Sequence, residues 1–395
     1  MKADFFTYQA QTSPHPLALE VSHAKGSFIY DVHGKAYLDF VAGVSANSIG
    51  HSHPAVTHAI TQQLEKYAHV MVYGEFVQAP QVQLCKLLVQ NSPKHLNSVY
   101  LTNSGTEATE GALKLAKRVT QRAEIIAAKN SYHGNTMGAM SVSGVERQNR
   151  AFRPLIPGTK FIEFNLEEDL QKITHKTAAV IVETIQGGAG FIVPTQQYLQ
   201  KLQQRCNEVC ALLIVDEIQT GIGRTGTFWG FENYHVQPDI VITGKGLGGG
   251  MPIGAFMASA KMMALLKDKP KLGHISTFAG HPVIAAAAKA TVHTILENNY
   301  MAAALHKETL IRKHLQHKAI VAIRGKGLML AALVETPALA AKVVHKCLEK
   351  GLILFFLLFE GRALRITPPL TISEEEIQQG CALIVAAIEE CYNTQ

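Results

Sequence analysis

A single lysine follows a predicted core strand and lies within a dense run of glycines. The stretch DIVITGKGLGGGMPIGA, residues 239–255, begins with β-branched residues and reaches Lys245 directly after Gly244. The glycines leave bare backbone against which a flat ligand can lie. Burial lowers the pKa of a lysine amine, and a neutral amine is a nucleophile toward carbonyl carbon. Lys245 is therefore a candidate Schiff-base lysine, and a solvated lysine in a surface loop is the alternative.

A second candidate, Asp216, ends an apolar run in ALLIVDEIQTGIGRTG, residues 211–226. A buried carboxylate needs a partner, because an unpaired buried charge is costly. A protonated pyridine nitrogen would serve, and Gln219 is near enough in sequence to hydrogen-bond a ring oxygen. A structural salt bridge or a helix cap would also satisfy the carboxylate. The G-x-G-x-x-G pattern that starts at Gly221 neither follows its strand directly nor opens a helix pattern, which disfavours a dinucleotide site.

A candidate anion site begins at Ser104. In LTNSGTEATEGALKLAKR, residues 101–118, Ser104 and Glu107 have the spacing of a capping box, which predicts a helix that starts there. The backbone N–H groups of Gly105 and Thr106 would then be free at the helix N-terminus, where a phosphate can bind. Helix capping without a ligand is the alternative.

Two further stretches supply an aromatic ring and hydroxyl groups. Tyr132, in KNSYHGNTMGA, could stack on a flat ring or could be a core residue. Ser276 and Thr277, in GHISTFAGHP, could donate hydrogen bonds to a phosphate. An amine for an aldehyde, a carboxylate for a ring nitrogen, an aromatic face and an anion site are together what pyridoxal phosphate requires. The set therefore predicts a site for that cofactor.

Strand, loop and helix patterns alternate from about residue 85. β-Branched runs predict strands at 98–103, 124–129, 159–165, 178–184, 211–217 and 239–244. This alternation predicts an α/β fold with a mostly parallel sheet wrapped by helices. In such sheets ligands bind outside the carboxyl ends of the strands, which is where the Ser104 loop, Tyr132, Asp216 and Lys245 are expected to lie.

The pattern changes after about residue 285. Alanine- and leucine-rich stretches predict helices at 283–317 and 337–350. Apolar runs predict strands at 327–335 and 351–359. We therefore expect a large cofactor-binding domain, 49–285, and a smaller α+β domain, 286–395. The N-terminal segment, 1–48, is expected to join the smaller domain.

The composition indicates a globular and rather apolar protein. Of its 395 residues, 47% are hydrophobic and 17% are charged, and the formal net charge of +6 forms no dense basic run, so a nucleic-acid partner is not expected. No apolar run is long enough for a membrane span or a signal peptide. The six cysteines form no CxxC pair, which favours reduced thiols and a cytoplasmic location. His51 and His53 lack further ligands at metal-site spacing, so no metal is expected.

The chain resembles the class III pyridoxal-phosphate aminotransferases, the group that contains acetylornithine, ornithine and 4-aminobutyrate aminotransferases. The motifs that carry the resemblance occur in the family's order: NSGTEA, YHGNT, DEIQTGIGRTG, GKGLGGGMPIGA and STFAGHP. The resemblance runs from GSFIYDVHGKAYLDF to RITPPLTIS, nearly the whole chain. It implies the fold type I architecture of pyridoxal-phosphate-dependent transferases. It also implies a homodimer whose active site lies at the subunit interface.

The resemblance also implies roles for the candidate residues. Lys245 would hold pyridoxal 5'-phosphate as an internal aldimine and later carry a proton, and Asp216 would pair with the ring nitrogen. Gln219 would bind the phenolic oxygen, while Tyr132 would stack on the ring. The expected cofactor-binding residues are Ser104, Gly105, Thr106, Tyr132, His133, Asp216, Gln219, Lys245 and, from the other subunit, Thr277.

Two departures from the family pattern concern the substrate. Many members of the acetylornithine and 4-aminobutyrate type have an arginine after HG that binds a substrate carboxylate, and this chain has Asn135 there. Many also have a glutamate in QGE that pairs with a second arginine, and this chain has Gly188. That second arginine is expected to be Arg365, bound to the α-carboxylate of glutamate and 2-oxoglutarate. Glu183 matches a glutamate that the family keeps near the cofactor, and it completes the expected substrate-binding set with Arg365 and Asn135.

The expected activity is transfer of an ω-amino group from an ornithine- or acetylornithine-like donor to a keto acid such as 2-oxoglutarate. An aminomutase or racemase on the same scaffold and an ω-amine:pyruvate transaminase are alternatives. A nucleotide-dependent dehydrogenase would rest on the Gly221 pattern alone. A non-catalytic role is disfavoured, because a degenerate member should have lost Lys245 or Asp216.

Overall fold

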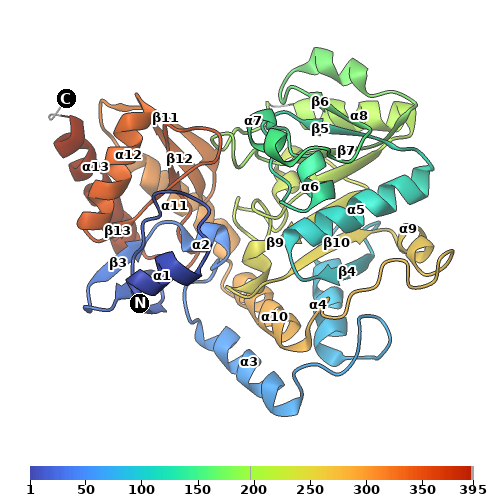
Figure 1. Cartoon of the computed structure of the whole chain (residues 1–395), viewed down its shortest axis with the longest axis horizontal. Coiled ribbons are helices and arrows are strands. Elements are labelled where there is room, and N and C mark those ends of the chain that lie inside the picture. Colours follow the sequence, from blue (N-terminus) through green and yellow to red (C-terminus); the bar gives the residue numbers. More distant parts are fainter. Residues whose placement is uncertain (196, 393–395) are drawn as a thin grey trace.

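A seven-stranded sheet forms the framework of the larger part of the molecule (Figure 1). The computed structural model describes residues 1–195 and 197–392. The sheet has the order β4-β10-β9-β8-β7-β5-β6, and all its strands run parallel except β10, which is antiparallel to both neighbours. Its strands are β4 (Ser98–Thr102), β5 (Glu124–Ala128), β6 (Thr159–Ile162), β7 (Thr177–Glu183), β8 (Leu212–Asp216), β9 (Ile240–Gly244) and β10 (Gly254–Ala258).

The central strands are buried on both faces, which explains their continuous apolar runs. Ile214 and Ile242 point into the core beneath α5 (Gly105–Thr120), whereas Val215 and Val241 point into the larger core on the other face. The further helices of this part are α3 (Pro54–Lys66), α4 (Ala79–Gln90), α6 (Met137–Ser141), α7 (Glu146–Asn149), α8 (Tyr198–Val209), α9 (Ala260–Met263) and α10 (Pro282–Glu297). The predicted sheet wrapped by helices is therefore confirmed.

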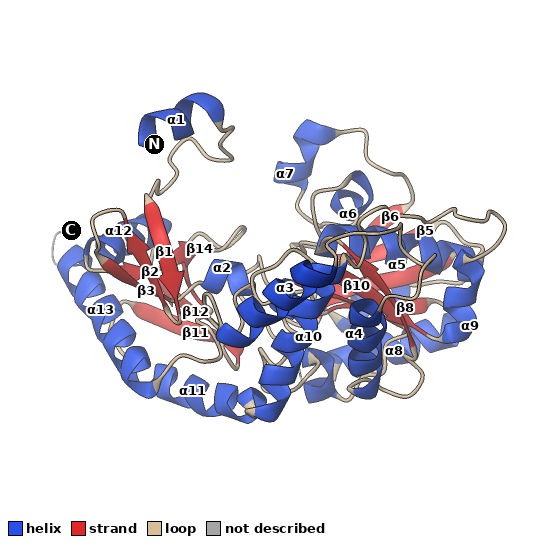
Figure 2. Cartoon of the chain, turned by 90° about the horizontal axis from the view of Figure 1, so that it is seen from below, coloured by secondary structure: helices blue, strands red, loops and turns tan. Residues whose placement is uncertain are grey.

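The N-terminal and C-terminal segments build the other end of the molecule together (Figure 1). One sheet has the order β1-β2-β3-β13 and a second has the order β11-β12-β15-β14. These strands are β1 (Val21–Lys25), β2 (Phe28–Asp31), β3 (Ala36–Asp39), β11 (Ile320–Lys326), β12 (Met329–Val334), β13 (Leu352–Ile353), β14 (Phe355–Phe356) and β15 (Ala363–Ile366). Figure 2 shows the long helices that border these sheets, and the helices of this part are α1 (Lys2–Tyr8), α2 (Ala42–Ser45), α11 (Tyr300–His314), α12 (Pro337–Glu349) and α13 (Glu374–Tyr392).

The pairing of β13 with β3 places an N-terminal strand and a C-terminal strand in one sheet. The expectation that the N-terminal segment, 1–48, joins the smaller domain stays a prediction. The boundary predicted near residue 285 falls within α10, which packs against α3 and α4. The division at residues 48 and 285 stays a prediction.

The strand predictions from local sequence failed in two places, one where a predicted strand is divided and one where a strand was missed. The apolar run 351–359 does not form one strand, because β13 joins β3 in one sheet and β14 joins β15 in the other. β10 was not predicted, although it lies between β4 and β9. Its sequence, GAFMA, lacks the β-branched residues that mark the neighbouring strands.

Two other expectations concern membranes and metals. Within residues 1–195 and 197–392, none of the helices has both the length and the apolar character needed to cross a bilayer. His51 Nε2 lies 2.7 Å from Asp39 Oδ2, and His53 Nδ1 accepts a hydrogen bond from the Ala55 N–H at the start of α3. The described part of the chain contains no group of three or more histidine, cysteine, aspartate or glutamate residues that could hold a metal.

Candidate active site

Most of the predicted site residues meet at one cavity of about 510 Å³ at the carboxyl ends of the parallel strands. The register of the sheet places Glu183 on β7 beside Asp216 on β8, and Asp216 beside Ile242 on β9. Lys245 follows β9 directly. The cavity is lined by the predicted residues Gly105, Thr106, Tyr132, His133, Asn135, Glu183, Asp216, Gln219, Lys245 and Arg365.

Lys245 begins a short 3-10 helix immediately after β9, with a φ of 40°. Burial lowers the pKa of its amine, and the charge of Arg365 lowers it further, while Asp216 and Glu183 oppose these effects. Glycines allow the surrounding backbone to come close: a Cβ on Gly244 would lie 3.4 Å from the Gly105 Cα. The lysine is therefore enclosed and disposed toward its neutral, nucleophilic form.

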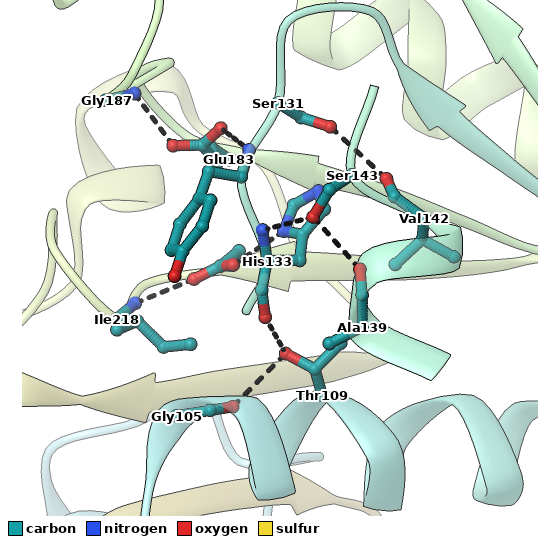
Figure 3. A network of polar contacts seen from close by, with 12 residues as sticks. Gly105, Thr109, Ser131, His133, Ala139, Val142, Ser143, Glu183, Gly187 and Ile218 are labelled. Atoms are coloured by element: carbon teal, nitrogen blue, oxygen red, sulfur yellow. Dashed lines mark hydrogen bonds and ion pairs between the residues drawn. The ribbon is translucent and has the colours of Figure 1, made fainter. Parts of the chain in front are cut away.

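Asp216 is held from two sides at the end of β8. Its Oδ1 accepts the Ile218 N–H at 2.9 Å, and its Oδ2 accepts from His133 Nδ1 at 2.7 Å. His133 is itself fixed, because its N–H donates to the Ser143 hydroxyl and its carbonyl accepts from Thr109 (Figure 3). Asp216 is only 4% exposed and pairs with no lysine or arginine in the described residues. The carboxylate is thus fixed in orientation, and its negative charge is available to a positively charged ligand in the cavity.

Glu183, beside Asp216, has both carboxyl oxygens engaged. Its Oε1 accepts the Tyr132 N–H at 3.0 Å, and its Oε2 accepts the Gly187 N–H at 2.7 Å (Figure 3). Burial raises the pKa of this carboxyl to about 7. The contact to Tyr132 ties the end of β7 to the loop after β5, so Glu183 supports the wall that carries the aromatic ring.

The start of α5 faces the cavity with Gly105 and Thr106. Ser104 caps the helix by accepting the Glu107 N–H at 3.3 Å, but Glu107 reaches the N–H of Asn103, not that of Ser104, at 2.8 Å. The capping box is therefore incomplete, because the Glu107 side chain binds the N–H one residue before the N-cap. Ser104 itself does not line the cavity.

Arg365, on β15, enters the cavity from the C-terminal part of the molecule. Its Nε donates to the Phe356 carbonyl at 3.3 Å, and its guanidinium lies 5.7 Å from the centre of the Phe191 ring. It is 5% exposed, and its Nη1 has no hydrogen-bond partner in the described residues. Burial lowers its pKa to about 10. A substrate carboxylate would satisfy this buried cation.

Sequence reasoning missed the apolar wall of the cavity. Ile185, Ile218, Phe355, Phe356 and Leu358 line it together with Val44. The phenylalanines stood in the run that was predicted as an ordinary buried strand, and no local signal shows that this run turns toward a site. Thr277 is exposed in this chain and does not line the cavity. Its expected role in the other subunit's site stays a prediction.

The family model for class-III aminotransferases matches residues 8–388 of this chain. The chain belongs to the class III aminotransferases. Acetylornithine aminotransferase of Caldanaerobacter subterraneus subsp. tengcongensis is 38% identical over 378 residues, which cover 93% of each chain. Its counterpart from Methanopyrus kandleri is also 38% identical, over 92% of each chain.

Among solved structures, the ornithine aminotransferase from Toxoplasma gondii superposes with a TM-score of 0.92 at 31% identity. That match covers 100% of this chain and 96% of the other. This class III aminotransferase is accordingly a pyridoxal-phosphate-dependent transaminase of fold type I, as the sequence motifs predicted. The dehydrogenase alternative is wrong.

Proposed function

We propose that this transaminase moves the ω-amino group of an ornithine- or acetylornithine-like donor to a 2-oxo acid, with Lys245 and Asp216 as its catalytic residues. The observation that carries the proposal is the cavity in which a half-buried lysine, an oriented carboxylate and a guanidinium without an ion-pair partner among the described residues meet. The similarity to acetylornithine and ornithine aminotransferases supports the choice of donor.

The residues around the cavity fit pyridoxal phosphate. Asp216 has no ion-pair partner except His133 in the described residues and can accept a hydrogen bond from the N–H of a protonated pyridine ring. The N-terminus of α5 offers backbone N–H groups to a phosphate. Gly134 permits that approach, because a side chain there would overlap Thr106. Tyr132 can cover the ring and Gln219 can reach its phenolic oxygen, with His133 and Ser104 as supporting residues.

When bound, pyridoxal phosphate supplies an electrophilic carbonyl carbon and a ring that withdraws electrons from the carbon that bears the amino group. Asp216 stabilises positive charge at the ring nitrogen, and His133 keeps the carboxylate in position through its Nδ1–H. The Lys245 amine is both nucleophile and base. Its Nζ would take a proton from the donor carbon that bears the amino group and pass it to the cofactor. Arg365 orients the 2-oxo acid through its carboxylate.

A half-reaction screen tests this proposal. The pyridoxal form of the enzyme is mixed in turn with ornithine, N-acetylornithine, 4-aminobutyrate, lysine, putrescine and β-alanine, and the visible absorbance of the cofactor is followed. At least one ω-amine should discharge it. A reaction with plain α-amino acids alone would overturn the ω-amine assignment. Borohydride reduction followed by peptide mass spectrometry should find the cofactor on Lys245.

We further propose that the enzyme works as a cytoplasmic homodimer. All six cysteines are free thiols, as a reducing compartment favours. Large apolar side chains are exposed just before α4 and next to Thr277, among them Phe76, Val77 and Phe278. A second copy of the chain would cover them and could bring its own Thr277 to the phosphate. Sedimentation of the holoenzyme tests this assembly.

A further inference from the structure

A second cavity of about 360 Å³ adjoins the active-site cavity. The two share Tyr132, Gly134 and Asn135 as lining residues, so a substrate chain that passes Asn135 leaves the first cavity and enters the second. The remaining wall of the second cavity includes Gln148 and Phe359. All of the described residues that line it are uncharged. The outer part of a substrate would therefore meet a neutral surface.

Among the described residues that line the first cavity, only one offers a cation to a substrate. Of the charged residues that line it, Asp216 and Lys245 belong to the cofactor under the proposed function, and Glu183 is held by two backbone N–H groups. This leaves Arg365, whose Nη1 is buried and has no partner in the described residues. One substrate carboxylate can be neutralised at this guanidinium, and a second one cannot.

At position 188, which lines the same cavity as Arg365, this chain has a glycine and therefore no carboxylate that could neutralise the guanidinium. Gly188 donates no side chain, and a Cβ there would lie 2.7 Å from Phe359 Cε2. The Phe359 N–H also donates to the Gly188 carbonyl at 2.9 Å, which fixes the ring-bearing segment against this glycine. Arg365 therefore stays charged and open in both half-reactions.

The polar groups of the second cavity cannot replace a cation. The Asn149 amide nitrogen donates to the carbonyls of Met140 and Ser143, at 3.2 and 2.6 Å. The Ser143 hydroxyl donates to the Ala139 carbonyl. These two donors are already engaged. The other polar side chains that line the cavity, Thr12, Tyr132, Asn135 and Gln148, are uncharged. An anionic group would lose its hydration there without gaining a charged partner, which is costly.

We propose that the amino acceptor of this enzyme is a 2-oxo acid with a single carboxylate and an uncharged side chain. Its carboxylate binds Arg365 and its side chain points past Asn135 into the second cavity. In the transfer, the 2-oxo carbon gains the amino group and a hydrogen and is reduced. Bound pyridoxamine phosphate would supply that amino group and the two electrons, and the oxygen of the 2-oxo group would pass to the cofactor by way of water. The inference rests on the proposed role of Arg365 and differs from the 2-oxoglutarate expected from the resemblance.

The acceptor half-reaction tests this inference without any donor. Enzyme loaded with pyridoxamine phosphate is mixed with 2-oxopentanoate, 2-oxoglutarate or the 5-methyl ester of 2-oxoglutarate in single-turnover experiments. The second-order rate constants for 2-oxopentanoate and the ester should exceed that for 2-oxoglutarate at least about tenfold, since one unpaired buried charge separates them. An equal or larger constant for 2-oxoglutarate overturns the inference. Failure of all ω-amine donors with active acceptors would instead overturn the proposed donor.

A variant that adds a positive charge to the cavity gives an independent test. Asn135→Arg should raise the ratio of the 2-oxoglutarate constant to the 2-oxopentanoate constant at least about tenfold. Asn135→Gln, which lengthens the side chain without charge, should leave that ratio within about threefold. Calorimetry with the unreactive pair glutarate and pentanoate should show the same shift in affinity. If Asn135→Arg does not fold, Gln148→Arg places a cation on the same cavity, and an unchanged ratio in the folded variant overturns the inference.

Discussion

Asp216 combines two contacts that a neutral amide cannot keep together. Its oxygens face the Ile218 N–H and His133 Nδ1, so an amide nitrogen at this position would oppose one donor. An amide would also remove the negative charge that the ring nitrogen needs. Asp216→Asn should therefore slow the donor half-reaction at least about 100-fold, measured by rapid mixing of the holoenzyme with its donor.

The matched control for this change is Asp239→Asn. Asp239 accepts the Leu213 N–H near the opposite end of the same strand, away from the cavity. It should lose stability in urea unfolding and keep the wild-type rate per folded holoenzyme. Equal rate losses in the two variants would show that Asp216 acts through folding alone.

Loss of the Arg365 guanidinium should affect the half-reaction with the 2-oxo acid more than the half-reaction with the donor. Arg365→Met keeps an unbranched chain in the buried position but removes the carboxylate partner. The affinity for the 2-oxo acid should fall about 10- to 100-fold, because a charge-assisted hydrogen bond is lost. Arg362→Met is the control, since Arg362 lies nearby but pairs with Glu360 at 2.8 Å. A similar effect in both variants in steady-state kinetics would contradict the assignment.

At the scale of elements, the ends of the central strands could be predicted from sequence, but the strands that are placed by long-range pairing could not. Runs buried on both faces, such as β8 and β9, carry a continuous apolar signal that ends where the site begins. β10 carries no such signal, because its place between β4 and β9 depends on long-range pairing. The break between β13 and β14 likewise depends on which distant strand each fragment meets.

The loop after β5 gives a prediction that belongs to backbone geometry. Gly134 has a φ of 125°, and a side chain there would overlap Thr106 at the start of α5. Gly134→Ala should weaken cofactor binding at least about tenfold by displacing the helix N-terminus. Gly34→Ala controls for the backbone term, since Gly34 has a φ of 84° but open space around it.

Both glycine variants should lose about 1 kcal/mol of stability from the positive φ. Only Gly134→Ala should lose cofactor when the protein is dialysed and the retained cofactor is measured by absorbance. Equal retention in the two variants would show that the anion site does not depend on this close approach.

At the scale of the whole molecule, the site requires both parts of the chain. The sequence pattern identified the residues that follow the parallel strands, but Arg365 comes from a separate sheet and was found only through resemblance. The apolar wall around Phe356 was not found by either route. Periodicity describes each element by itself and says nothing about which distant element will face it. The missing part of the site was therefore tertiary in origin.

The pH dependence of stability is a property of the whole molecule that follows from its buried carboxyls. Glu217 is fully buried and accepts the N–H groups of Gly230 and Phe231 at 2.6 and 3.0 Å. Burial raises its pKa to about 7, above the ordinary value of 4.5. The folded protein therefore keeps this proton while the unfolded chain releases it. The free energy of unfolding should fall as pH rises from about 4.5 to 7 and then level off, with about 3 kcal/mol due to this group.

Glu217→Gln isolates this contribution, because the amide does not titrate. Glu183 adds a decline of the same sign in the same window, since burial also raises its pKa to about 7. The variant should be less stable at low pH, where it loses a hydrogen-bond acceptor, but its stability should decline less steeply between pH 5 and 7. Urea unfolding of the holoenzyme at several pH values measures the two slopes. Parallel curves for wild type and variant would mean that Glu217 is already ionised in the folded protein, so that its backbone and hydroxyl donors outweigh its burial.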